Sequence, residues 1–175
     1  MRKLKLDELN RLSPEEFRTA PRAAVCVVLD SIRSMHNVGS VFRSADAFGI
    51  EKVWLCGYSP RPPHRDIRKV AIGAEDSMDW EYEREITQVL QRLKADGWKL
   101  IAVEQTDSSL PLQEFKSEKG DKIALIFGNE VKGVADAALE LCDLAIEIPQ
   151  FGTKHSLNIS VAAGIVLYHT VLIGK

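Results

Sequence analysis

Apolar residues in this chain gather into short continuous runs, each about the length of a β-strand and each closed by polar residues, glycine or proline. Continuous runs of this kind are typical of strands that are buried on both faces, as in a parallel sheet covered by helices. The runs predict strands at residues 23–29, 52–56, 98–103, 122–127 and 144–148.

The stretches between these runs carry the signals of helices. Ser13 can cap a helix that has Pro14 at its first position and Glu16 as the partner in a capping box. Residues 57–68 are rich in proline, arginine and histidine, and we expect them to form a loop. Apolar residues at helical spacing predict further helices at residues 38–48, 83–95, 135–141 and 157–172.

The order of these elements predicts the fold class. Strands that alternate with helices indicate an α/β protein with a mostly parallel sheet flanked by helices. With 175 residues, the chain has the length of one domain with a substantial core. No linker, repeat or low-complexity segment divides it, so we expect a single domain over residues 1–175, with residues 1–22 as a short N-terminal helical extension.

Composition and charge change this interpretation only slightly. Hydrophobic residues make up 45% and charged residues 27%, which is typical of a soluble globular domain, and the net charge of −2 argues only mildly against a nucleic-acid binder. Cys26, Cys56 and Cys142 lie far apart in apolar runs, so we expect buried reduced thiols rather than disulfides or a metal site. No signal-peptide pattern is present, and no run approaches the ~20 apolar residues of a membrane span. We therefore expect a cytoplasmic protein without a bound metal.

The first candidate for function lies in the predicted helix at residues 38–48. Asn37 can cap this helix and Gly49 can end it. The apolar residues of the helix cluster on one face, and Arg43 lies nearly opposite them. Arg43 is therefore either a solvated arginine on an amphipathic helix or a guanidinium directed at a phosphate or at a second subunit.

The second candidate is Gly128-Asn-Glu130-Val-Lys-Gly133, which directly follows the predicted strand at residues 122–127. Sheets of α/β proteins commonly bind ligands in such loops, at the carboxyl edge. The segment is not a P-loop, because it lacks Gly-Lys-Ser/Thr, and the chain contains no G-x-G-x-x-G dinucleotide fingerprint. A plain tight turn accounts for a glycine but not for Asn129-Glu130, so a ligand site is the second interpretation.

The third candidate runs from Ile148 through Gly152 to Asn158 and leads from a predicted strand into the last predicted helix. Ser156 or Asn158 can cap this helix, whose N-terminus offers free N–H groups to an anion. The helix is apolar on nearly all sides. It is therefore expected to lie centrally in the fold or against another subunit.

Together, the three segments resemble the motifs of the SpoU/TrmH family of knotted RNA 2′-O-methyltransferases. They match N-x-G-x-x-x-R-x-A from Asn37, F-G-x-E-x-x-G from Phe127, and I-P-(M)-x-G-x-x-x-S-L-N-x-S-x-A from Ile148, in the order of the family. The resemblance covers the chain from Ala23 to its end and departs from the pattern at Gln150, where methionine is common.

The resemblance implies a sheet whose C-terminal third is threaded into a trefoil knot, with S-adenosylmethionine bound in the knot. It also implies methyl transfer to a ribose 2′-hydroxyl of RNA. The absence of a dinucleotide fingerprint agrees with this different mode of cofactor binding. The cofactor-binding positions of the family correspond here to Val103, Gly128, Ile148, Ser156 and Leu157.

The catalytic positions of the family correspond to Arg43, Asn37, Glu130, Ser156 and Asn158. With the three motifs numbered one to three in chain order, the family gives the central catalytic role to the arginine of motif one, which is Arg43 here. A guanidinium stays protonated in proteins, so we expect Arg43 to hold an RNA phosphate and stabilise the developing alkoxide rather than act as a base. We expect Asn37 and Glu130 to orient Arg43 and the active-site loop, and Ser156 and Asn158 to order the knot and the substrate.

Members of the family are homodimers whose sites are completed across the interface, which suits an outward-facing Arg43 and an apolar last helix. For contact with RNA, two local clusters of basic residues are available, although such clusters are also common in solvated loops. The better cluster contains Arg61, His64, Arg65, Arg68 and Lys69, and the second contains Arg2, Lys3 and Lys5.

Several functions remain open within this interpretation. The compact chain and Asn37-Val-Gly favour tRNA as the substrate, with rRNA as the alternative. A non-catalytic RNA-binding protein on the same fold is a second alternative, but Arg43, Gly128 and Gly152 are all present. An α/β enzyme with another nucleotide cofactor is a third, and the missing phosphate-binding fingerprints count against it.

Overall fold

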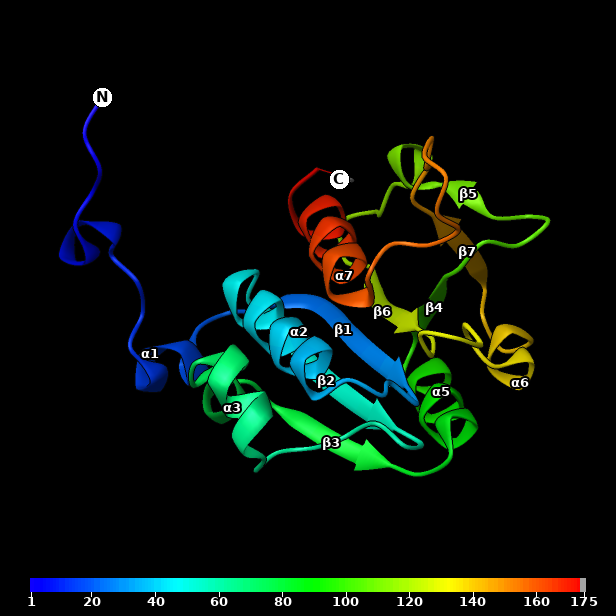
Figure 1. The fold of residues 1–175 in the computed structure, drawn as a ribbon, viewed down its shortest axis with the longest axis horizontal. Coiled ribbons are helices and arrows are strands. Elements are labelled where there is room, and N and C mark those ends of the chain that lie inside the picture. Colours follow the sequence, from blue (N-terminus) through cyan, green and yellow to red (C-terminus); the bar gives the residue numbers. More distant parts are fainter. Residues whose placement is uncertain (174–175) are drawn as a thin grey trace.

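The computed structural model describes residues 1–173 and contains a seven-stranded parallel sheet with the order β3-β2-β1-β6-β4-β7-β5 (Figure 1). The six pairs of neighbouring strands in this sheet are all parallel, as the alternation of strands and helices predicts. The strands are β1 (Ala23–Asp30), β2 (Ile50–Cys56), β3 (Trp80–Glu83), β4 (Trp98–Val103), β5 (Leu110–Pro111), β6 (Lys122–Phe127) and β7 (Leu144–Glu147).

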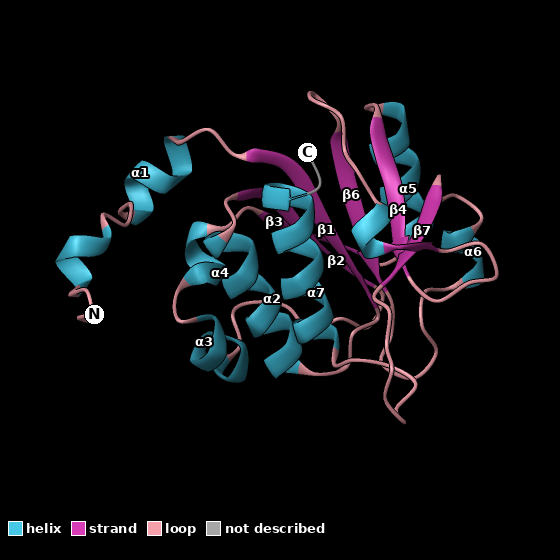
Figure 2. Cartoon of the chain, turned by 90° about the horizontal axis from the view of Figure 1, so that it is seen from above, coloured by secondary structure: helices cyan, strands magenta, loops and turns pink. Residues whose placement is uncertain are grey.

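Helices cover both faces of this sheet (Figure 2). Short 3₁₀ turns occupy Leu6–Leu9 and Leu112–Glu114, and a π-helical turn, His169–Ile173, follows the last helix. The helices are α1 (Pro14–Thr19), α2 (Met35–Ala47), α3 (Arg65–Ala71), α4 (Ala74–Ser77), α5 (Ile86–Ala95), α6 (Asp136–Leu139) and α7 (Ile159–Tyr168). The predicted fold class, an α/β protein with helices flanking a mostly parallel sheet, is confirmed. The trefoil knot stays a prediction from the family resemblance.

The central strand β1 explains why the apolar runs are continuous. Val27 and Leu29 belong to the hydrophobic core under α2 and α7, whereas Cys26 and Val28 belong to a second core under α5 and α6. All four side chains are fully buried. Since successive side chains of a strand point to opposite faces, a strand covered on both sides needs apolar residues at every position.

The predicted strands are all present, within a few residues of their predicted ends. The strands that the pattern missed lie at the edges of the sheet. Among the described residues β3 pairs with β2 alone, and its sequence Trp-Glu-Tyr-Glu alternates because one face of the strand is covered. The helix predicted at residues 83–95 therefore begins later, at Ile86, after this strand.

The prediction of a loop over residues 57–68 is wrong at its end, because α3 begins at Arg65. His64 caps this helix, with Nδ1 accepting a hydrogen bond from the Asp66 backbone N–H (3.2 Å). Ile67 and Ala71, four residues apart, form its buried stripe. Two apolar positions in a polar segment are too weak a pattern to reveal so short a helix.

The N-terminal extension projects from the body of the molecule (Figures 1 and 2). The predicted capping box of α1 is confirmed, since Ser13 accepts from the Glu16 backbone N–H (3.2 Å) and Glu16 accepts from the Ser13 N–H (2.8 Å). Arg22 attaches the end of the extension through an ion pair with Asp79 (2.9 Å).

The three cysteines are free thiols, as predicted, and Cys26 and Cys56 are fully buried. Burial, as the leading cause, raises the pKa of Cys56 to about 12 and that of the half-buried Cys142 to about 11. These thiols therefore stay protonated near neutral pH and are poor nucleophiles. No helix within residues 1–173 is both long and apolar enough to cross a membrane.

Candidate active site

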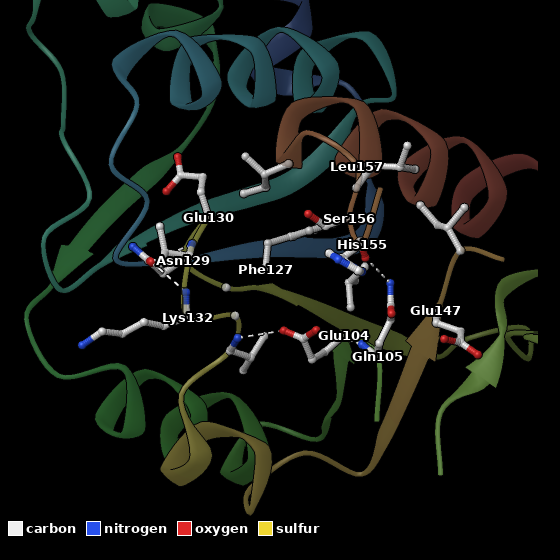
Figure 3. A pocket seen from close by; sticks show the side chains of 18 of the residues that line it. Glu104, Gln105, Phe127, Asn129, Glu130, Lys132, Glu147, His155, Ser156 and Leu157 are labelled. Carbon is white, nitrogen blue, oxygen red and sulfur yellow. Dashed lines mark hydrogen bonds between the residues drawn. The ribbon is translucent and has the colours of Figure 1, made fainter. Parts of the chain in front are cut away.

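A pocket of ≈ 710 Å³ lies at the carboxyl edge of the sheet, between the loops that follow β4, β6 and β7 and the start of α7 (Figure 3). This is the position at which open α/β sheets commonly bind ligands. The pocket combines apolar side chains, backbone groups and several carboxylates. Its lining includes all five positions that the family resemblance assigns to the cofactor: Val103, Gly128, Ile148, Ser156 and Leu157.

The loop after β6 has a fixed conformation. Asn129 and Gly133 exchange two backbone hydrogen bonds of 2.9 Å, which close the loop into a tight turn. The Asn129 side chain accepts from the backbone N–H groups of Val131 (3.0 Å) and Lys132 (3.1 Å) and donates to the Ser31 carbonyl (2.6 Å). Asn129 therefore holds both the turn itself and its contact with the loop after β1.

Both glycines of this loop are required by its geometry. A Cβ on Gly128 would overlap the backbone of Gly133 and Val134. Gly133 has φ +70°, and a Cβ there would overlap the Glu104 carboxylate. The spacing of the two glycines in motif two thus follows from close contact within the turn and with β4.

Motifs one, two and three meet in a chain of hydrogen bonds. The Glu130 carboxylate accepts from the backbone N–H groups of Arg33 (2.9 Å) and Ser34 (3.2 Å) and from Nδ2 of Asn37 (3.0 Å). Oδ1 of Asn37 in turn accepts from Nδ2 of Asn158 (3.2 Å). Three residues that the sequence predicts at the site are therefore brought together, although they lie far apart along the chain.

The caps of helices α2 and α7 differ in part from those that the sequence predicts. Ser34, and not Asn37, caps α2, with its hydroxyl accepting from the Asn37 backbone N–H (3.2 Å). Asn37 lies in the first turn, where its amide is free to join Glu130 to Asn158. Asn158 is the cap of α7, with Oδ1 accepting from the Ser160 backbone N–H (2.8 Å). Ser156 stands before this cap and lines the pocket.

The surroundings of Glu130 predict a pH dependence of stability. Burial acts to raise its pKa, but hydrogen bonds led by that from the Arg33 backbone N–H outweigh burial, so the pKa lies below its ordinary value. A carboxylate with a lowered pKa in the folded state stabilises the protein above its unfolded-state pKa and loses that contribution as the pH falls through the folded value. Glu130→Gln should therefore lower the free energy of unfolding at pH 7 by less than about 1 kcal/mol, because the side chain is exposed.

Urea unfolding at a series of pH values tests this prediction. The gap between wild type and Glu130→Gln should narrow as the pH falls from about 5 toward 3. Glu140→Gln, at another exposed glutamate, is the matched control. A gap that is constant or that widens in acid would show that the Glu130 charge does not stabilise the loop.

Arg43 lies apart from the other predicted catalytic residues. It is exposed on α2 and lines a second hollow, between α2, α4 and the N-terminal extension. Within residues 1–173 its guanidinium has no hydrogen-bond or ion-pair partner. Within one chain, Glu130 contacts Asn37 and the loop before α2, at Arg33 and Ser34, and neither Asn37 nor Glu130 contacts the Arg43 guanidinium in the described residues. Their expected role in orienting Arg43 stays a prediction.

The loop between β7 and α7 forms one wall of the pocket. Gln105, after β4, donates from Nε2 to the His155 carbonyl (3.0 Å) and so joins two walls. Phe151 is 98% exposed on this loop, and a Cβ on Gly152 would meet no atom within 4 Å. Gly152, although it matches the family motif, is therefore not required by contacts within residues 1–173.

The basic residues predicted to bind RNA are all exposed, but they differ in their partners. Arg61 lies over the Tyr82 ring (4.1 Å from the guanidinium carbon to the ring centroid). Arg68 is paired with Asp76 (3.0 Å) and Glu75 (3.7 Å), which partly neutralise it. Of the others, Arg65 is 3.6 Å from Asp66, His64 caps α3, Lys69, Lys3 and Lys5 are exposed, and Arg2 is paired with Glu8 (2.6 Å).

Sequence reasoning missed Glu104, which lines the pocket directly after β4. Its position at the carboxyl end of a strand is the available signal, but none of the three motifs includes it. Within residues 1–173, no group of three or more histidine, cysteine, aspartate or glutamate side chains is placed to hold a metal ion.

The fold and the pocket define an α/β protein whose pocket is formed by three loops at one edge of a parallel sheet. Residues 24–168 match the SpoU rRNA Methylase family, so the chain belongs to this family. The chain is 33% identical over 82% of its length to the 23S rRNA (guanosine-2′-O-)-methyltransferase RlmB of Neisseria meningitidis and 29% identical over 86% to the tRNA (guanosine(18)-2′-O)-methyltransferase of Escherichia coli K12. It spans 56% and 63% of the lengths of these two relatives.

A solved structure shows the same fold. The AdoMet-bound rRNA methyltransferase of Sinorhizobium meliloti superposes with a TM-score of 0.78 at 25% identity, over 90% of this chain and 59% of the other. The resemblance to the SpoU/TrmH family that the three motifs indicate is therefore confirmed in sequence and in fold.

Proposed function

We propose that this protein is an S-adenosylmethionine-dependent methyltransferase that modifies a ribose 2′-hydroxyl in RNA. The observation that carries the proposal is that motifs two and three line one pocket, and that Glu130 and Asn158 of these motifs are hydrogen-bonded to Asn37 of motif one. Its relatives are named as guanosine 2′-O-methyltransferases of rRNA and tRNA. tRNA is the favoured substrate and rRNA the alternative.

The residues of the pocket fit the cofactor. A cavity of ≈ 710 Å³ is of the size that takes a ligand like S-adenosylmethionine. Val103, Phe127 and Leu157 offer apolar surface to an adenine ring, and the backbone at Gly128 and Ile148 offers hydrogen-bonding groups. When bound, the cofactor supplies an electrophilic methyl group on a sulfonium.

The residues of this chain have separate tasks in the proposed reaction. The ribose oxygen must be positioned and must lose its proton as it attacks. Arg43 holds an RNA phosphate and stabilises the negative charge that develops on that oxygen. The hydrogen bonds among Glu130, Asn37 and Asn158 fix the positions of the pocket loops relative to one another. Ser156, just before α7, contacts the substrate or the cofactor.

The protein acts as a homodimer in which Arg43 of one subunit completes the pocket of the other. Two features support this arrangement. Arg43 lies outside the pocket of its own chain. Several apolar residues of α7 and the turn after it are also exposed, and a second subunit would cover them: Val161, Ile165, Tyr168, Leu172 and Ile173.

RNA binds along the exposed basic residues near α3. Arg61 is the strongest candidate, because a guanidinium that stacks on an aromatic ring can also stack on a base. Arg65, His64 and Lys69 supply phosphate contacts, and the ion pairs of Arg68 must be exchanged for RNA. Residues 1–175 act as one methyltransferase domain with residues 1–22 as an extension, in the cytoplasm.

Isothermal titration with S-adenosylmethionine tests the proposal. Binding at micromolar to submillimolar cofactor is the expected result. No detectable heat up to millimolar cofactor would refute the enzyme and leave a non-catalytic RNA-binding protein as the better interpretation. Mapping 2′-O-methylation in RNA from a deletion strain then identifies the modified nucleotide and decides between tRNA and rRNA.

A further inference from the structure

Glu104 is a pocket residue to which the three motifs assign no role. It follows β4 directly, and its carboxylate lies below Phe127, Ser156 and His155 in the view of Figure 3. One oxygen accepts from the Gln105 backbone N–H (2.9 Å) and the other from the Val134 N–H (3.0 Å). The carboxylate is thus held in a single orientation at the wall of the pocket.

These two hydrogen bonds leave part of the capacity of the carboxylate unused. Each oxygen of an ionised carboxylate can accept about two hydrogen bonds. Each oxygen of Glu104 accepts one from the protein within residues 1–173. A group that is already oriented loses little entropy when it takes a further donor, so Glu104 is prepared to bind a ligand with hydroxyl or ammonium donors.

Among the groups of an adenosine cofactor, the ribose diol fits this position best. Val103 adjoins Glu104 at the end of β4, and the apolar side chains of Val103 and Phe127 line the same pocket. A ribose attached to an adenine on that surface has two hydroxyl donors, and carboxylates at the ends of strands bind such diols in other α/β folds. Resting on the proposed function, we infer that Glu104 binds the ribose hydroxyls of the cofactor while holding the Gly133–Val134 turn against β4.

A binding cycle separates the ribose contact from the structural role. Adenosine and 2′,3′-dideoxyadenosine are titrated into wild type and Glu104→Gln. Wild type should prefer adenosine by about tenfold, the size expected for hydrogen bonds to a charged group, and Glu104→Gln should lose most of that preference. A purely structural role would weaken both ligands equally and leave the preference unchanged.

Glu147→Gln is the matched control, because it removes a carboxylate from the same pocket at the end of β7. It should leave the preference for adenosine as in wild type. If Glu104→Gln fails to fold, as judged by circular dichroism, Glu104→Asp keeps the charge, shortens the reach and should reduce the same preference.

Two results would overturn this inference alone, and a third would overturn it together with the proposed function. The first is an equal loss of affinity for both nucleosides in the Glu104 variant. The second is a loss of affinity for S-adenosylhomocysteine with adenosine unchanged, which would assign Glu104 to the ammonium group instead. In either case wild type still binds S-adenosylmethionine, so the proposed function stands. If wild type does not bind S-adenosylmethionine, the inference and the proposed function fall together.

Discussion

Arg43→Ala should lower the rate of methyl transfer by about 10²–10³-fold, the usual cost of removing one group that stabilises developing charge. The affinity for S-adenosylmethionine should change by no more than about 0.5 kcal/mol, because Arg43 is an exposed residue outside the pocket of its own chain. Arg43→Lys should recover only part of the rate, since it keeps the charge but loses the planar fork of donors. Single-turnover kinetics and calorimetry measure the two effects separately.

Arg84→Ala is the control, because Arg84 is also an exposed arginine and has no role in the proposed site. Near-normal turnover in Arg43→Ala would remove Arg43 from the catalytic machinery. Equal losses of turnover and cofactor affinity would instead assign Arg43 to cofactor binding.

Mixing two inactive variants tests whether Arg43 acts across a dimer. In a mixed dimer of Arg43→Ala and Gly128→Ala, one of the two sites combines an intact arginine with an intact pocket. At a cofactor concentration low enough that Gly128→Ala alone is nearly inactive, random exchange of subunits should restore about a quarter of the wild-type activity. No recovery after demonstrated subunit exchange would place Arg43 and the pocket it serves in the same chain.

Gly128→Ala should have the second large effect. A Cβ at this position overlaps the backbone of Gly133 and Val134, so the turn that carries Asn129 and Glu130 must move. Overpacking of this kind costs roughly 1–3 kcal/mol, which corresponds to about a 10–100-fold loss of cofactor affinity if the strain falls on the bound state. Calorimetry with S-adenosylmethionine measures the loss, and urea unfolding shows how much of the strain the folded protein carries without ligand.

Gly152→Ala is a matched control, because it makes the same change in another motif where a Cβ meets no atom within 4 Å. Its free energy of unfolding and cofactor affinity should stay within about 0.5 kcal/mol of wild type. If Gly152→Ala were the more damaging of the two, Gly152 would be required by the bound cofactor, by RNA or by a second subunit.

The parts of the fold that sequence predicts best are those buried on both sides. β1, β4 and β6 are central strands with apolar residues at nearly every position, and their predicted bounds agree closely with the structure. β3 and β5 lie at the edges and have too little apolar surface to mark them. α3 was missed for the same reason, since only Ile67 and Ala71 are buried on it.

The sequence predicts the part of the site that lies within the motifs. The five cofactor positions inferred from the family resemblance all line one pocket. Asparagine favours the cap position, so the sequence predicts Asn37 as a cap of α2, whereas Ser34 caps the helix in the structure. The Asn37 amide instead bonds Glu130, 93 residues away, a contact that no local pattern reveals. Glu104 was missed because its two partners, Gln105 and Val134, are backbone amides that no sequence pattern records.

The most direct test of the central claim is an analysis of the product. The purified protein is incubated with unmodified tRNA and rRNA and with S-adenosylmethionine that carries a deuterated methyl group, and the RNA is digested to nucleosides for mass spectrometry. We expect a deuterated methyl group on the ribose of one nucleoside, formed about 10²–10³-fold more slowly with Arg43→Ala. A methyl group on a base, or no transfer to either RNA by a protein that binds the cofactor, would contradict it.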